Sequence, residues 1–112
     1  MKMSKPATNV TITLSHKAQS RLETLTGATP DEKIAHLLLG ETWRNLEACE
    51  QERLALKVRY GIEYPEFRRQ LEAGTLGDAF SYELEKDAVR WEDLIAEKQH
   101  WLQQLRLARE WL

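Results

Sequence analysis

The 112-residue sequence predicts a mainly helical protein that begins with a single β-strand. An alternating apolar segment lies near the start, a strong helix-start signal follows at Thr29, and residues 84–112 contain neither glycine nor proline. Only 5 Gly and 3 Pro accompany 30% charged residues, which is typical of a helix-rich globular chain. The length allows one modest hydrophobic core.

The predicted strand covers residues 9–14. Its apolar and polar side chains alternate strictly, as in a half-buried strand. The apolar face holds Val10, Ile12 and Leu14, and the polar face holds Asn9, Thr11 and Thr13. No later segment has the pattern of a second strand, and a lone strand leaves its backbone donors and acceptors unpaired. We therefore expect the same strand of a second copy to pair with it in an antiparallel two-stranded ribbon.

Two helices are predicted after the strand. Ser15 offers an N-cap to a short helix that Gly27 ends. Thr29, Pro30 and Glu32 then form a capping box with proline at the first helical position. This second helix is expected to run to Tyr60.

The order of one strand, a short helix, a capped turn and a second helix resembles the ribbon-helix-helix family over residues 9–39. The resemblance implies a homodimer whose ribbon enters the major groove of operator DNA. Asn9, Thr11 and Thr13 would then face the bases. Lys2, Lys5, Lys17 and Arg21 would contact phosphates, with Thr29 near the DNA backbone. Residues 1–22 contain no acid, which favours an anionic partner. The alternative is a dimerisation clamp with no role in DNA binding.

A hinge and a short helix are expected next. Gly61 ends the long helix, Pro65 starts a short one, and Gly74 terminates it. A turn at Gly77-Asp78 leads to Phe80, Tyr82 and Leu84, whose alternation predicts a short extended stretch.

This middle region resembles the C-terminal half of small prokaryotic antitoxins of the TumA group, over about residues 57–95. The resemblance lies in the spacing of Tyr60-Gly61, Glu66-Phe67, Gly77-Asp78 and Trp91-Glu92. It implies a head, residues 1–60, that dimerises and represses its operon, and a tail, residues 61–112, that wraps a cognate protein toxin.

The last helix is predicted to extend about 40 Å at 1.5 Å per residue. A heptad seam fits its apolar residues, so a coiled coil is one interpretation. That seam is Leu84, Ala88, Trp91, Ile95, Lys98, Leu102, Leu105, Arg109 and Leu112. In projection the apolar side chains spread over about 160°, wider than one neighbour needs. We therefore expect this helix to bind a partner as well as its own chain, although packing against earlier helices is the alternative.

The predicted partner-binding residues are Phe80, Tyr82, Trp91, Leu94, Trp101, Leu105 and Ala108. Trp101 is the expected anchor, because tryptophan is enriched in interface hot spots. From residue 72 onward nine acids oppose five bases, which favours a basic partner.

The sequence offers no catalytic motif. His36 and Cys49 lie thirteen residues apart along one helix, about 140° round its axis, so they cannot meet within a subunit. No metal or cofactor site is expected, nor a small-molecule substrate or a membrane span. The lone Cys49 cannot form an internal disulfide, which favours the cytoplasm. The expected function is that of a non-enzymatic antitoxin, and the alternative is a helical oligomerisation or interaction module.

Overall fold

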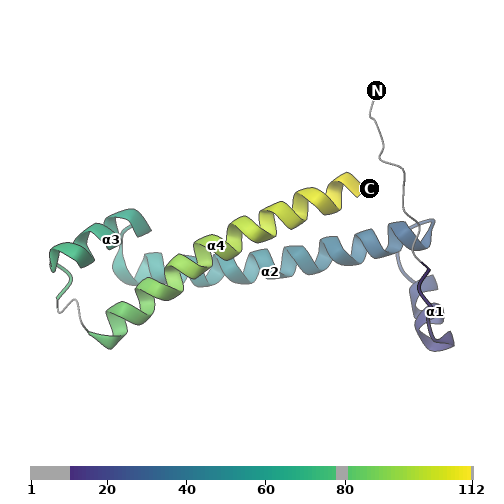
Figure 1. Ribbon diagram of the computed structural model, residues 1–112, viewed down its shortest axis with the longest axis horizontal. Coiled ribbons are helices and arrows are strands. Elements are labelled where there is room, and N and C mark those ends of the chain that lie inside the picture. The colour runs from purple at the N-terminus through teal and green to yellow at the C-terminus, as the bar shows by residue number, and fades with distance from the viewer. Residues whose placement is uncertain (1–10, 78–80, 112) are drawn as a thin grey trace, which may run out of the picture.

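The computed structural model describes residues 11–77 and 81–111, without the side chain of Trp111. Four helices cover most of these ranges: α1 (His16–Glu23), α2 (Pro30–Tyr60), α3 (Tyr64–Ala73) and α4 (Tyr82–Trp111). Helix α4 folds back along α2, and α3 sits at the end where the chain turns (Figure 1). The molecule is elongated, with extents of 58 × 38 × 20 Å.

The prediction of an N-terminal strand is wrong for the described part of the segment. Residues 11–15 have no regular secondary structure, and Ile12 and Leu14 are 67% and 45% exposed. Val10 and Asn9 lie outside the described residues. Alternation gives a segment the side-chain pattern of a strand, but a strand also needs a hydrogen-bonded neighbour, which these residues lack within the described chain.

The predicted helix starts are confirmed by their caps. The Ser15 hydroxyl accepts a hydrogen bond from the Ala18 amide at 3.1 Å, and the Thr29 hydroxyl accepts one from the Glu32 amide at 3.2 Å. The Glu32 carboxylate reaches back to the Ala28 amide at 2.7 Å. These contacts satisfy amides that a helix start otherwise leaves unpaired.

The predicted glycine terminators are also confirmed for two helices. Gly61 ends α2 at φ 70° and Gly74 ends α3 at φ 74°, both in the left-handed region that glycine tolerates. Both glycines lie between α2 and α4, which packs along α2.

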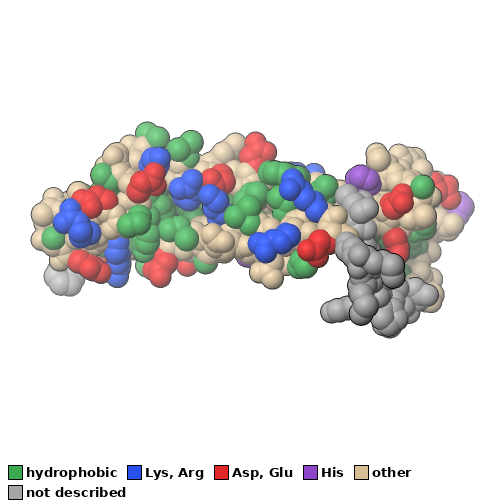
Figure 2. Space-filling view, turned by 90° about the horizontal axis from the view of Figure 1, so that it is seen from above, with side chains coloured by type: hydrophobic (Ala, Val, Ile, Leu, Met, Phe, Trp, Pro, Cys, Tyr) green, Lys and Arg blue, Asp and Glu red, His purple; other side chains and the backbone are tan. Residues whose placement is uncertain are grey.

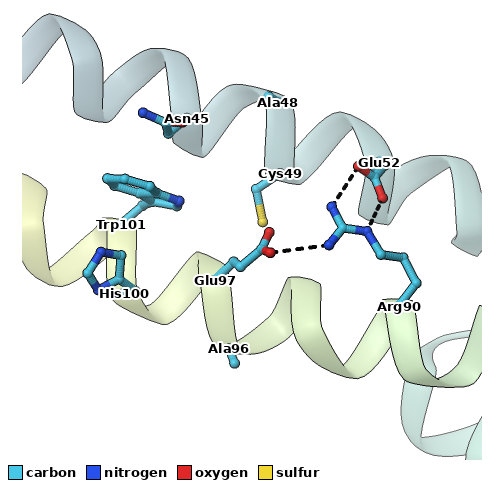
Figure 3. A pocket seen from close by; sticks show the side chains of 9 residues that line it. All are labelled: Asn45, Ala48, Cys49, Glu52, Arg90, Ala96, Glu97, His100 and Trp101. Atoms are coloured by element: carbon cyan, nitrogen blue, oxygen red, sulfur yellow. Dashed lines mark hydrogen bonds and ion pairs between the residues drawn. The ribbon is translucent and has the colours of Figure 1, made fainter.

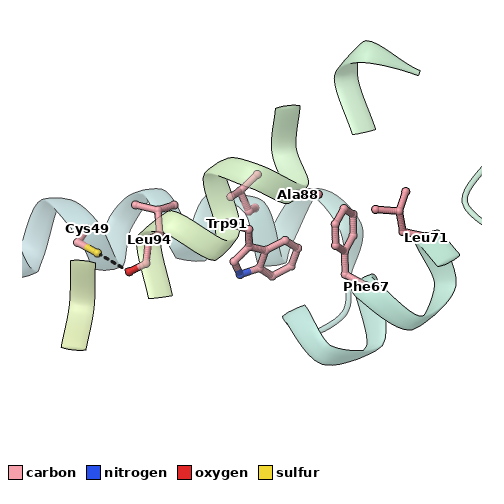
Figure 4. Close-up of a cluster of buried hydrophobic side chains, with 7 residues drawn as sticks. Cys49, Phe67, Leu71, Ala88, Trp91 and Leu94 are labelled. Carbon is pink, nitrogen blue, oxygen red and sulfur yellow. Dashed lines mark hydrogen bonds between the residues drawn. The ribbon is translucent and has the colours of Figure 1, made fainter. Parts of the chain in front are cut away.

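The core is the seam between α2 and α4. Buried residues on α2 recur with heptad spacing: Ala35, Thr42, Leu46, Cys49 and Leu56. On α4 the buried residues are Asp87, Ala88, Trp91, Leu94, Leu105 and Ala108. Figure 4 shows the part of this seam nearest α3, where Phe67 and Leu71 of α3 join it. Its register on α4 passes through Leu94 and Ala108 and leaves Ile95 and Leu102 only half-buried, which differs from the predicted seam by one residue.

An aromatic cluster fixes the corner where α2, α3 and α4 meet. Phe67 and Trp91 are fully buried, with ring centroids 5.0 Å apart. The ring of Tyr60 lies 4.6 Å from that of Phe67, and the ring of Tyr64 lies 5.6 Å from that of Trp91. The predicted boundary between the head, residues 1–60, and the tail, residues 61–112, falls within this cluster. Tyr82 begins α4, so the extended stretch predicted to reach Leu84 is replaced by helix there.

No helix in the described part of the chain has the length and apolar character needed to cross a bilayer.

Candidate protein-binding surface

A groove of about 570 Å³ runs between α2 and α4 (Figure 3). It is lined by Asn45, Ala48, Cys49 and Glu52 from α2, and by Arg90, Ala96, Glu97, His100 and Trp101 from α4. An ion-pair network closes one end and aromatic side chains close the other. The groove is open to solvent along its length.

Arg90 is the centre of the ion-pair network. Its guanidinium binds both carboxylate oxygens of Glu52, one of them at 2.8 Å, and also reaches Glu97 at 3.2 Å. The hydrogen bonds to Glu52 raise the pKa of Arg90 and lower that of Glu52. The network therefore links α2 to α4 and leaves no free cation in this part of the groove.

The Cys49 thiol is buried beneath the network and donates a hydrogen bond to the Leu94 carbonyl at 3.1 Å. Burial raises its pKa, and the nearby carboxylates of Glu97 and Glu50 raise it further. A thiol held in its protonated form is a poor nucleophile and a poor metal ligand. Within the described residues, no group of three or more His, Cys, Asp or Glu side chains could hold a metal ion.

Trp101 lies at the other end of the groove, where its ring points from α4 toward Asn45 of α2 (Figure 3). The ring is half-buried and meets the His100 ring edge-on, with centroids 4.7 Å apart. Asn45 donates its amide hydrogens to the Glu41 carbonyl and carboxylate. Trp101 is thus positioned by its own chain and still offers part of its surface.

The predicted partner-binding residues divide into buried and accessible groups. Trp91, Leu94, Leu105 and Ala108 are each at most 7% exposed and hold α4 against α2. These four side chains therefore pack within the chain, as in the alternative interpretation in which the last helix packs against earlier helices. Tyr82 is 74% exposed and Trp101 is half-buried, whereas Phe80 lies outside the described residues.

The predicted DNA-binding residues that the structure describes are all exposed. Thr11 and Thr13 are exposed in the segment without regular structure, and Lys17 and Arg21 are exposed on α1. The Thr29 hydroxyl is occupied by the cap of α2. Lys2, Lys5 and Asn9 lie outside the described residues.

A second apolar surface lies at the end of the molecule that carries α1. Leu37 and Leu38 are each 47% exposed, and Leu107 is 50% exposed. A shallow groove of about 140 Å³ separates Leu38 on α2 from Leu107 on α4. Helix α1 buries none of its own residues. Leu37 lies two residues after buried Ala35, about 200° round the helix, so it faces away from α4. We call Leu38 and Leu107, which line this groove, the α1-end patch.

Sequence reasoning missed the interactions of Asp87. This carboxylate is 6% exposed, and it accepts hydrogen bonds from the Tyr60 hydroxyl and from Arg59 at 2.8 Å. Burial, together with the hydrogen bond to Asp87, raises the pKa of Tyr60 to about 12. The available signal was the position of Asp87, four residues before Trp91 on the buried side of α4.

Comparisons with protein families, curated proteins and solved structures found no match to this chain.

Proposed function

We propose that this chain acts as the antitoxin of a toxin–antitoxin pair and neutralises a protein toxin by occluding it with residues after Gly61. The resemblance of residues 57–95 to TumA-group antitoxins supports the proposal. The observation that carries it is that α4 bears large apolar side chains on two sides. One side packs on α2, and the other leaves Tyr82, Val89 and Leu107 between 50% and 74% exposed.

Occlusion needs a shaped surface and no chemistry of its own, which suits this molecule. The groove guanidinium is fully engaged by Glu52 and Glu97, and the Cys49 thiol has a raised pKa. Apolar side chains reach the surface between charged ones along the helix pair (Figure 2). Protein-binding patches commonly have this mixture of apolar centres and polar rims. A protein with one free thiol fits the cytoplasm, the compartment we propose for it.

We also propose that two copies associate through the α1-end patch. An isolated helix as short as α1, with 8 residues, is marginal in water unless it packs on something. This dimer uses no β-ribbon, and operator binding is not part of the proposal.

The test is co-expression with the product of the neighbouring reading frame of the same operon. We expect that product alone to arrest growth, co-expression of the full chain to restore it, and the two proteins to elute together in size-exclusion chromatography. A helical protein of similar size serves as the control. Unchanged growth arrest on co-expression, or separate elution, would contradict the antitoxin function. The second candidate, an oligomerisation module, predicts self-association of the chain and no complex.

A further inference from the structure

The outward side of the first half of α4 carries an apolar ridge. Tyr82 and Val89 are 74% and 61% exposed and lie two helical turns apart on one side of α4. Grooves border Val89 on both sides. One, of about 450 Å³, is lined by Tyr82, Glu85, Lys86, Val89, Arg90 and Asp93. The other, of about 530 Å³, separates α3 from α4 beside Leu71 and Val89. We call Tyr82, Glu85, Lys86, Val89 and Asp93 the Val89 face.

The charges on this part of α4 differ between its inward and outward sides. Toward α2, Asp87 is paired with Arg59 at 2.8 Å, and Arg90 is paired with Glu52 and Glu97. Toward solvent, Glu85 and Asp93 are exposed and form no ion pair within the described chain. Lys86 is the one cation of the Val89 face. The face therefore keeps an excess of negative charge around its apolar ridge.

We infer that the Val89 face docks a basic surface of the protein partner, with Val89 and Tyr82 in apolar contact and Glu85 and Asp93 opposite Lys or Arg side chains. This inference rests on the proposed function and identifies the surface and the chemistry of its partner. The apolar contact supplies most of the affinity, and the charged rim selects a basic partner and speeds its association. The face lies at the α3 end of the molecule and leaves the α1-end patch free.

The apolar contact is tested with two matched valine variants. Val58 on α2 is 75% exposed and lies two residues after buried Leu56, about 200° round the helix, so it faces away from α4. Val89→Glu and Val58→Glu thus place the same charge at two exposed helical positions. The probe is the product of the neighbouring reading frame, with affinity measured by isothermal titration calorimetry. We expect Val89→Glu to weaken binding at least tenfold and Val58→Glu to change it less than twofold.

The charged rim is tested with two matched glutamate variants. Glu47 on α2 is exposed and unpaired within the described chain, as Glu85 is on α4. We expect Glu85→Lys to weaken binding about tenfold at low ionic strength and to flatten its dependence on salt, because exposed charge pairs are screened by salt. Glu47→Lys should leave both properties nearly unchanged.

The outcomes separate this inference from the proposed function. If the wild-type chain fails to bind the probe, both are overturned. If the wild type binds and Val89→Glu binds equally well, or if Val58→Glu is weakened as much as Val89→Glu, the Val89 face is wrong and the antitoxin function stands. An unchanged salt dependence in Glu85→Lys would overturn the basic character assigned to the partner.

Discussion

Replacement of Trp91 by alanine should destabilise the fold far more than replacement of Trp101. Trp91 is fully buried, and its ring packs against those of Tyr60, Tyr64 and Phe67 at centroid distances of 5.0 to 6.1 Å. Truncating a buried tryptophan to alanine costs about 3 to 5 kcal/mol, through lost burial and the cavity left behind. Trp101 is half-buried. Because Trp101 keeps part of its surface in water and borders an open groove, its truncation leaves no enclosed cavity, and Trp101→Ala should cost less, about 2 kcal/mol.

The assay is urea unfolding followed by circular dichroism at 222 nm, which does not depend on tryptophan fluorescence. A loss of 3 to 5 kcal/mol is a large part of the stability of a small domain, about 5 to 15 kcal/mol. Trp91→Ala should therefore unfold at much lower urea concentration. Trp101→Ala should stay folded and lose about 2 kcal/mol of partner affinity, about 30-fold, if Trp101 anchors the toxin. Equal destabilisation by the two substitutions would refute this reasoning and assign Trp101 to the core.

Three further predictions follow from individual contacts. The pKa of Tyr60 is raised from 10.0 to about 12, so the stability that its protonated hydroxyl contributes is complete below pH 10 and is lost between pH 10 and 12. Absorbance at 295 nm should show a late phenol titration that Tyr60→Phe removes. Persistence of the late titration in Tyr60→Phe would contradict its assignment to Tyr60. The Cys49 thiol should react with a disulfide reagent slowly in the native state and at the rate of a free cysteine in urea, and a fast native reaction would show that α2 and α4 do not enclose it. Leu38→Glu should convert the proposed dimer to monomer in sedimentation velocity without loss of helicity, whereas Leu54→Glu, at a similarly exposed position on α2, should stay dimeric; if both variants stay dimeric, the α1-end patch is not the interface.

Local signals predicted most of the helical fold. The caps at Ser15 and Thr29 and the terminators at Gly61 and Gly74 depend on neighbouring residues only, so they could be read directly from the sequence. The strand predicted at residues 9–14 is wrong over residues 11–14, which the structure describes without regular secondary structure. Whether an alternating segment forms a strand depends on a hydrogen-bonded neighbour, and no single-chain pattern supplies one.

The candidate surface was harder to predict than the fold because it depends on the register of α4. The observed seam places Leu94 and Ala108 against α2, one residue from the predicted Ile95 and Arg109, and leaves Leu102 only partly buried. Helical periodicity alone does not distinguish these registers, since both keep apolar residues three and four apart. The observed register buries Asp87, which is possible because Arg59 and Tyr60 of α2 donate hydrogen bonds to it. Since these partners lie on another helix, the sequence of α4 alone does not indicate that register.

Helix α4 folds back on α2 within one chain, so that its inward side builds the core and its outward side faces solvent. Nuclear Overhauser spectroscopy on a mixture of isotope-labelled and unlabelled chains tests this most directly. We predict strong contacts within one chain between the Trp91 indole and the rings of Phe67 and Tyr60. The absence of these contacts, or their appearance only between labelled and unlabelled chains, would contradict the account.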